Sequence, residues 1–256
     1  MTWLLLLLLS TVTAFSIRRS KSMTRMSKDS SVDSLLNEVF SSNEPVSILG
    51  FGSLLSQTSS KSTFPSLQNF RLIKVEGFRR VFQHPAFIFF ERGIAQGNRI
   101  SSLSTEPAEG CSYVAVAFEI SGESKESWLK REEEFAFTLA PYTGSNGDVG
   151  VGLVCTGTTD DVYIQRWGRE KYDQQLSLYN LPGIWGDDIN KQILPCSVYL
   201  RHCVLGAKSL GDECYTSFLD DTYLVDRRTT IREYLEANPE VMDTLPPESL
   251  VGRYSG

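Results

Sequence analysis

The stretch Val46–Leu55, V-S-I-L-G-F-G-S-L-L, decides how the rest of the chain is interpreted. Its first four residues predict a buried strand. Gly50 and Gly52 then allow backbone turns that residues with a Cβ resist. A Gly-Ser pair directly after a strand can present bare N–H groups to a ligand, because no side chain blocks the approach. The stretch therefore predicts either a strand that ends in a plain turn or one half of a ligand site.

Other motif interpretations of this stretch fail. Gly50-x-Gly52 begins like a dinucleotide-binding fingerprint, but Leu55 stands at the third glycine position and a Ser-rich stretch follows where a helix is required. The chain has no G-K-S/T sequence, and Ser53 is not set in G-x-S-x-G. The two histidines, His84 and His202, stand in aromatic or apolar surroundings that favour structural roles.

Composition excludes several function classes. The chain has 256 residues and 41% hydrophobic content, which is typical of a globular domain with a real core. Residues 1–28 contain five basic and no acidic side chains, and the remainder has 20 basic and 31 acidic ones, a net charge of −11. That charge repels phosphate backbones, so no nucleic-acid partner is expected. The five scattered cysteines lack C-x-x-C spacing, which predicts free thiols in a reducing compartment and no metal site.

The amino terminus has the composition of a targeting address. Trp3–Leu9 is too short to span a membrane and suits the apolar core of a signal peptide. Thr13-Ala14-Phe15 offers a cleavage site, and Ser16–Lys28 is basic and free of acids, as transit peptides are. The order resembles the bipartite plastid-import signal of algae with secondary plastids. We therefore assign residues 1–30 to a plastid address, with no stable membrane association after processing; secretion is the alternative.

Residues 31–256 are predicted to form a single α+β domain, a small mixed β-barrel or curled sheet with flanking helices and a helical extension from about residue 160. Periodicity and turn residues predict the elements in chain order. They are a helix at Val32–Phe40, a strand at Val46–Leu49, a loop at Gln57–Ser66, strands within Phe70–Gln83 interrupted at Gly77, a strand at Ala86–Glu91, a polar connection over 92–111, a strand at Ser112–Ile120, a helix at Ser121–Phe137, a strand at Asp148–Cys155, and helices at Asp160–Leu181, Asp187–Ala207, Asp212–Leu219 and Ile231–Ala237, the last capped by Thr229 or Thr230.

Three consecutive acids, Glu132, Glu133 and Glu134, lie further along the chain than the buried strand predicted at Ser112–Ile120. On a helix their side chains would point about 100° apart, so one or two could face inward. A solvated acidic face is one interpretation of this cluster. In the other, burial raises the pKa of one glutamate and suits it to general acid–base chemistry.

The sequence Gly-Phe-Gly-Ser-Leu at 50–54, with an acid after a buried strand, resembles the γ-glutamylcyclotransferase superfamily, which carries a Tyr/Phe-Gly-Ser loop and one essential glutamate. Gly77–Phe82 is similar to the G-Y-R-R-x-F stretch of the ChaC-type members, and Ser112–Ile120 to the strand that precedes the family's glutamate. Its acid lies four residues after a leucine, which from Leu129 gives Glu133, and Arg131 matches the plant-type variant. The resemblance covers about Val46–Cys155 and departs in having Phe51 where tyrosine is common.

The resemblance implies a γ-glutamylcyclotransferase-like fold with Glu133 as the catalytic residue and Phe51, Gly52, Ser53 and Leu54 as the substrate-binding loop. The substrate would be a γ-glutamyl peptide, such as glutathione, whose own α-amine attacks the γ-carbonyl and releases 5-oxoproline. The reaction needs positioning and proton transfer, so no cofactor or metal is implied. The glutamates on either side leave the register of the catalytic acid open by one residue.

Two other functions fit the same residues: a non-catalytic ligand-binding or regulatory protein on this fold, and a cyclotransferase acting on γ-glutamylamines. Arg79 and Arg80 are predicted either to bind a substrate carboxylate or to form strand-edge salt bridges. Tyr142 and Trp185 are predicted to stack on a substrate or to pack in the core. The substrate, the oligomeric state and the role of the C-terminal helices stay open at the level of sequence.

Overall fold

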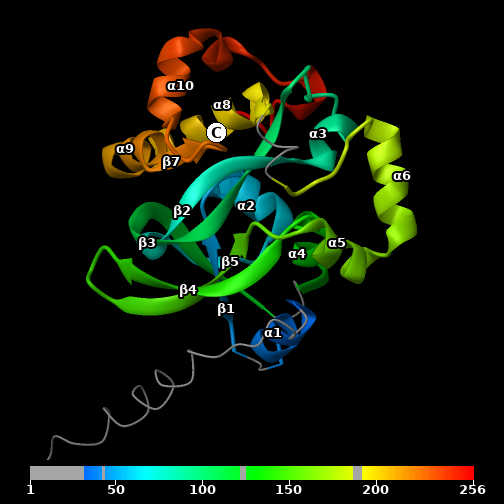
Figure 1. The fold of residues 1–256 in the computed structure, drawn as a ribbon. Helices are drawn as coiled ribbons and strands as arrows, with labels where there is room; N and C mark the ends of the chain where they lie inside the picture. Colours follow the sequence, from blue (N-terminus) through cyan, green and yellow to red (C-terminus); the bar gives the residue numbers. More distant parts are fainter. Residues whose placement is uncertain (1–31, 42–43, 122–124, 187–191) are drawn as a thin grey trace, which may run out of the picture.

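A closed ring of five strands forms the centre of the computed structural model, which describes residues 32–41, 44–121, 125–186 and 192–256 (Figure 1). The ring runs β3–β1–β5–β4–β2 and closes because β2 also pairs with β3. The β1–β5 pair is parallel and the other pairs of the ring are antiparallel. The strands are β1 (Val46–Gly50), β2 (Gln68–Pro85), β3 (Arg99–Ile120), β4 (Ala136–Gly144) and β5 (Val149–Thr156). The predicted α+β class with a small mixed barrel is confirmed.

Two short strands extend the ring. β6 (Leu194–Pro195) pairs with β3 and β7 (Thr222–Leu224) pairs with β2, both in parallel. They come from the C-terminal third of the chain, so this part is attached to the barrel by backbone hydrogen bonds as well as by packing. The predicted targeting address lies outside the described residues and stays a prediction.

The long hairpin of β2 and β3 corrects one prediction. Residues 92–111 were expected to form a polar connection, but β3 begins at Arg99 and continues through Ile120. Its serines and threonines misled the prediction because they lie inside the barrel, where Ser104 accepts a hydrogen bond from Gln83 at 2.5 Å. Gly77 has a φ of +77° and a register shift beside it, which explains the predicted interruption within β2.

Two short helices were also missed. α2 (Gln57–Thr63) replaces the predicted loop, because Ser56 caps it and the Ser60 hydroxyl donates to the carbonyl of Leu54 at 2.8 Å. α3 (Phe87–Glu91) replaces a predicted aromatic strand, with Phe87 and Phe89 buried. For α2 a local cap decides the helix, and for α3 burial of the two phenylalanines outweighs local strand propensity.

The segment after β3 holds a shorter helix than predicted. α4 (Lys125–Arg131) ends before the glutamates, and β4 begins at Ala136 where helix was expected to Phe137. The 132–134 segment is therefore a turn, held by a hydrogen bond from the N–H of Glu132 to the carbonyl of Trp128. A turn can direct adjacent side chains to different surroundings more freely than a helix.

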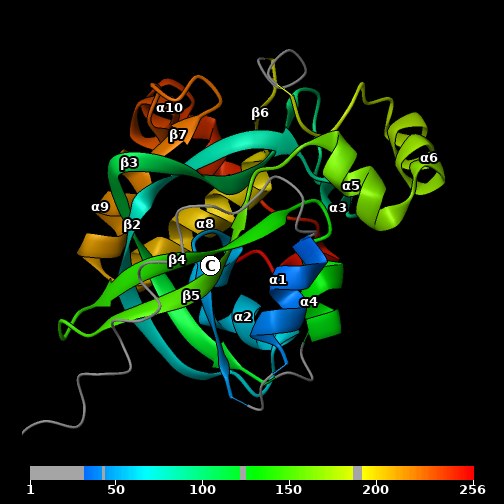
Figure 2. The same ribbon diagram turned by 60° about the horizontal axis from the view of Figure 1, so that its bottom comes forward.

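The remaining helices pack around the barrel, with α5 and α6 on one side and α8, α9 and α10 together on another (Figures 1 and 2). Gly168, at a φ of +91°, divides the predicted helix over 160–181 into two. Thr230 caps α10 in a capping box with Glu233. The bounds are α1 (Val32–Val39), α5 (Asp160–Trp167), α6 (Arg169–Tyr179), α8 (Ser197–Ser209), α9 (Asp212–Asp220) and α10 (Ile231–Ala237); of the predicted helix Asp187–Ala207, residues 187–191 lie outside the described ranges.

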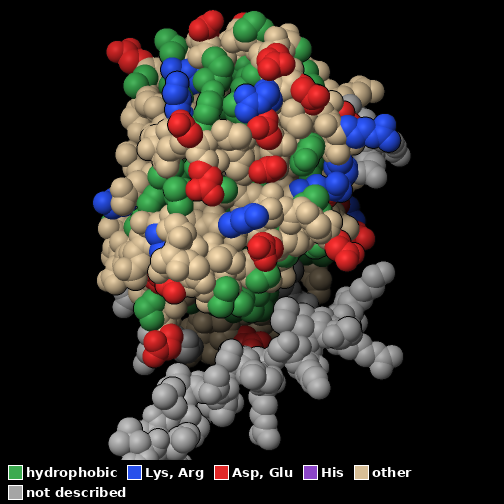
Figure 3. All heavy atoms as spheres, turned by 90° about the vertical axis from the view of Figure 1, so that its left-hand side faces the viewer, with side chains coloured by type: hydrophobic (Ala, Val, Ile, Leu, Met, Phe, Trp, Pro, Cys, Tyr) green, Lys and Arg blue, Asp and Glu red, His purple; other side chains and the backbone are tan. Residues whose placement is uncertain are grey.

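The core is continuous from the barrel into the helices. β3 is buried on both faces over 113–118, as its apolar run predicted. All five cysteines are free, and four of them are buried. On the face of the molecule shown in Figure 3, acidic, basic and hydrophobic side chains are interspersed.

Candidate active site

A cavity of about 780 Å³ lies between the barrel and the helices. It is lined by the end of β1 and the loop after it, by the turn that contains the three glutamates, and by α2, α3, α8 and the C-terminal segment. All five residues to which the sequence assigned a role in the site, Phe51, Gly52, Ser53, Leu54 and Glu133, are among its lining. The cavity therefore joins segments that are about 80 residues apart in sequence.

The loop after β1 enters a single 3₁₀ turn, η1 (Ser53–Leu55), with Gly52 as its N-cap. The first N–H groups of any helix lack a partner within it. Within the described ranges, the N–H groups of Ser53 and Leu54 donate to no protein acceptor. A Cβ at Gly52 would lie 2.6 Å from the Tyr199 hydroxyl, so this close approach requires glycine. The loop can thus present two N–H groups to a ligand.

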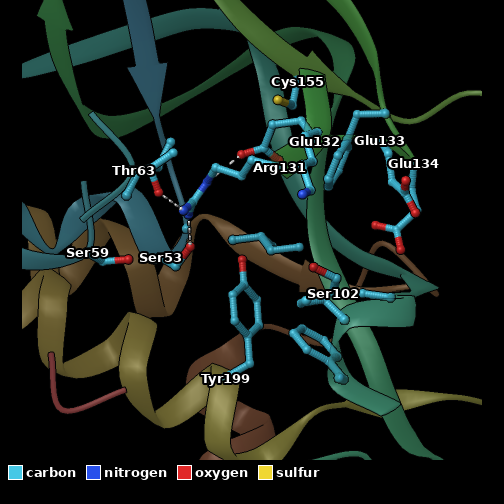
Figure 4. A pocket seen from close by; sticks show the side chains of 18 of the residues that line it. Ser53, Ser59, Thr63, Ser102, Arg131, Glu132, Glu133, Glu134, Cys155 and Tyr199 are labelled. Atoms are coloured by element: carbon cyan, nitrogen blue, oxygen red, sulfur yellow. Dashed lines mark hydrogen bonds and ion pairs between the residues drawn. The ribbon is translucent and has the colours of Figure 1, made fainter. Parts of the chain in front are cut away.

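Arg131 connects this loop with the acid cluster (Figure 4). Its Nε donates to Glu132 Oε1 at 2.8 Å, its Nη2 to the Ser53 hydroxyl at 2.8 Å, and its Nη1 to the Thr63 hydroxyl at 2.7 Å. Both side chains of the Arg131–Glu132 pair are only 12% exposed. A guanidinium held at three points fixes the carboxylate of Glu132 relative to the Gly52-Ser53 turn.

The three glutamates have different surroundings. The Glu132 side chain also lies beside the thiol of Cys155, whose pKa is raised well above its ordinary value by burial and then by the Glu132 charge. Glu133 instead accepts a hydrogen bond from Lys171 Nζ at 2.6 Å, at the more exposed rim of the cavity. The family resemblance assigned the catalytic role to Glu133 and left a shift of one residue open. In the structure, Glu132 is the acid that is linked to the loop, through Arg131.

Glu134 is the most deeply buried of the three. Its Oε1 accepts the N–H of Phe87 at 2.7 Å, and its Oε2 lies 4.0 Å from Nε2 of His84. Burial raises the pKa of Glu134 to about 8 and lowers that of His84 to about 3, so both side chains are favoured in their neutral forms near pH 7. His84 stacks on Trp185 at 4.2 Å between ring centroids. The histidine therefore packs in the core, in agreement with the structural role predicted for it.

Helix α8 and the C-terminal segment complete the cavity wall. Tyr199 directs its hydroxyl toward the cavity (Figure 4), and His202 accepts the N–H of Gly256 through Nδ1 at 3.0 Å. Arg253 and Tyr254 line the same space. Sequence reasoning missed these residues, since no pattern in the sequence places the end of the chain against the first strand.

Several other residues considered from the sequence have structural contacts. Arg79 bonds to Glu106 at 2.6 Å, which is the predicted strand-edge salt bridge. Arg80 is fully buried and donates to backbone carbonyls. Tyr142 accepts a hydrogen bond from Arg71, and Trp185 packs on His84. None of these four is part of the cavity lining.

Within the described part of the chain, no group of three or more His, Cys, Asp or Glu side chains is placed to hold a metal ion. No helix among the described residues has the length and apolar character to cross a membrane.

Comparison with known proteins adds solved structures of low similarity. No family model and no curated protein sequence matches the chain. A protein named gamma-glutamyl cyclotransferase aligns with 55% of this chain and 89% of its own at 11% identity, with a TM-score of 0.38. An uncharacterized protein from Homo sapiens gives the same coverage at 12% identity and a TM-score of 0.38. A protein from Arabidopsis thaliana covers 53% of this chain and 88% of its own at 11% identity, with a TM-score of 0.35.

Likenesses of this size state what the chain is similar to and do not establish an activity. The aligned part is little more than half of the chain.

Proposed function

We propose that this protein is a γ-glutamylcyclotransferase in which Glu132 acts as the general base and then as the general acid. One observation carries the proposal: Arg131 binds the Glu132 carboxylate and the Ser53 hydroxyl at once, so the acid and the loop share one cavity. The chemistry needs a carboxylate and hydrogen-bond donors in this arrangement. The family resemblance in sequence gives the reaction type.

In the proposed reaction the α-amine of the γ-glutamyl group attacks its own γ-carbonyl. The N–H groups of Ser53 and Leu54 bind either the substrate α-carboxylate or the developing oxyanion. Glu132 accepts a proton from the attacking amine and returns it to the departing amine, so that 5-oxoproline and a free amine leave. Because the attack is intramolecular, the cavity accelerates it mainly by holding the bent conformer.

The alternative of a non-catalytic binding protein predicts glutamates that point to solvent. Glu132 and Glu134 are 9% and 6% exposed and line the cavity, so the geometry favours the enzyme. Burial of a carboxylate is costly unless it is paired, and Glu132 is paired.

The test compares three single variants in an assay of 5-oxoproline released from a panel of γ-glutamyl compounds that includes glutathione. We expect Glu132→Gln to lower the kcat/KM of folded protein about 10³-fold, since proton transfer is lost and the shape is kept, and to lower the urea-unfolding midpoint, since Arg131 loses its ionic partner. Glu133→Gln is the matched control and should stay within about threefold.

A large loss in Glu133→Gln alone would restore the register that the sequence assigned and contradict the role of Glu132. If the unmodified protein releases 5-oxoproline from no member of the panel, the proposal is overturned. The alternative of a non-catalytic binding protein then stands.

A further inference from the structure

Two arginines line the cavity without a carboxylate partner. Arg92 follows α3 and Arg253 lies in the C-terminal segment, and both face the space that Arg131 and Glu132 also line. Arg92 Nη1 donates to the Tyr254 hydroxyl at 2.5 Å, and Arg253 Nη1 donates to the Ser62 hydroxyl at 3.4 Å. Across the described ranges, neither guanidinium has an acidic side chain at ion-pair distance.

The two charges are close enough to affect one another. The pKa of Arg253 is lowered by burial, then by Arg92 and by Arg131. Of these three arginines only Arg131 is neutralised, by Glu132. The cavity acids Glu91 and Glu134 form no ion pair with Arg92 or Arg253. Like charges gathered at a partly buried wall favour the binding of an anion between them.

We propose that Arg92 and Arg253 form a subsite for the carboxylate of the leaving group, so that the substrate class is a γ-glutamyl amino acid or peptide with a free carboxylate. This inference rests on the proposed function. In this proposal the γ-glutamyl half lies at Glu132 and the Ser53 turn, and the leaving half extends to Arg92 and Arg253 in the lining of the same cavity. Planar guanidinium groups bind carboxylates with paired hydrogen bonds.

The subsite excludes the γ-glutamylamines as preferred substrates. Their leaving groups are neutral or cationic, and two unpaired arginines at the wall would repel a cation. The subsite also gives the C-terminal segment a function, because Arg253 is supplied by residues well beyond the part of the chain that carries the family resemblance.

The experiment uses a matched pair of substrates, γ-glutamylalanine and γ-glutamylalanine amide, which differ in the leaving-group carboxylate alone. We expect kcat/KM for the acid to exceed that for the amide at least about tenfold, the size of a hydrogen bond to a charged group. Arg253→Gln and Arg92→Gln should each reduce this ratio severalfold, whereas Arg253→Lys should retain part of it. Arg228→Gln removes an exposed arginine outside the cavity lining and should leave the ratio unchanged.

The outcomes separate the subsite from the proposed function. Equal turnover of acid and amide by the unmodified protein overturns the subsite and leaves the function intact. An equal loss on both substrates in Arg253→Gln also overturns it, because the arginine would then serve the α-carboxylate that both share.

If neither substrate yields 5-oxoproline, the proposed function fails. The subsite is then tested by comparing the binding affinities of the acid and the amide. Calorimetry on the Glu132→Gln variant, which retains both arginines, then measures the affinity for acid and amide without turnover. Tighter binding of the acid by about tenfold, abolished by adding Arg253→Gln, supports the subsite, and equal affinity overturns it.

Discussion

Two arginines inside this molecule, Arg80 and Arg131, have opposite surroundings. Arg80 extends from β2 and is fully buried between the rings of Tyr113 and Phe218, at 4.8 and 5.0 Å. It donates to the carbonyls of Val114 and Ser217, at 3.1 and 2.6 Å. Arg131 lines the cavity and binds a carboxylate and two hydroxyls.

The difference shows how environment assigns a role to the same side chain. Burial lowers the pKa of Arg80 to about 10, yet its neutral partners and α9 hold it as a fixed support between the barrel and the helix. Arg131 instead forms an ion pair with Glu132 in the lining of a cavity. Partners, and not residue type, separate a structural arginine from one that positions the proposed catalytic acid.

The largest expected effects come from two single variants, in each of which one of these arginines is replaced by methionine. Arg131→Met should lower the kcat/KM of folded molecules about 10³-fold, because Glu132 loses its fixed position, and should also lower stability, because that carboxylate stays buried without its partner. Arg80→Met should lower the free energy of unfolding by about 3 kcal/mol and leave the activity of folded molecules nearly unchanged, because two buried carbonyls lose their donor. Urea unfolding and 5-oxoproline release measure the two quantities; a strong loss of activity in folded Arg80→Met would remove the distinction.

A second prediction concerns the loop to which Arg131 is bound. Gly52→Ala should reduce kcat/KM about 10²-fold, since its Cβ would lie 2.6 Å from the Tyr199 hydroxyl and the loop must shift. Adding Tyr199→Phe removes the clashing oxygen and should recover part of the activity. If the double variant is no better than Gly52→Ala, the cause is not this contact.

A third prediction sharpens the contrast between paired and unpaired buried charges. Glu134 has a pKa of about 8 in the folded protein against 4.5 ordinarily, so the native state binds the extra proton between these values. The free energy of unfolding contributed by this group therefore falls as pH rises from about 4.5 to 8. Glu134→Gln keeps the acceptor for the Phe87 N–H and lacks the titration. Relative to the unmodified protein, its free energy of unfolding should rise by about 4 kcal/mol between pH 5 and pH 9, measured by urea unfolding. A difference between the two proteins that does not vary with pH would contradict the buried neutral acid.

The smallest effect is expected at the rim. Lys171 pairs with Glu133 at 2.6 Å, with side chains 37% and 20% exposed. Lys171→Met should change stability by less than about 1 kcal/mol and activity by less than about threefold, and added salt should erase the difference. A loss comparable to that of Arg131→Met would assign Glu133, and not Glu132, to the reaction.

The acid cluster shows how far sequence alone reached. The pairing of the Gly-Phe-Gly-Ser loop with an acid near residue 133 came from the resemblance to a known superfamily, and both line one cavity. Which acid faces the loop could not be predicted, because α4 ends at Arg131 and a turn directs three adjacent side chains to three different partners. Spacing from Leu129 assumes a regular backbone across that turn.

The barrel shows the same limit. Apolar runs identified β1, β5 and the buried half of β3, because their side chains pack in the core whatever the neighbouring strand is. The polar half of β3 was missed, because the fold buries its side chains against other segments, as where Gln83 donates to Ser104.

The sequence by itself determined the α+β class and the glycine loop, since these depend on periodicity and backbone freedom, and a family resemblance pointed to a nearby acid. Tertiary structure decided which acid is linked to the loop through Arg131, the neutral state of Glu134, and the placement of Arg92 and Arg253 in one cavity. Each of these depends on burial and on charges brought together from distant segments, and such free energies have no local signature in a chain.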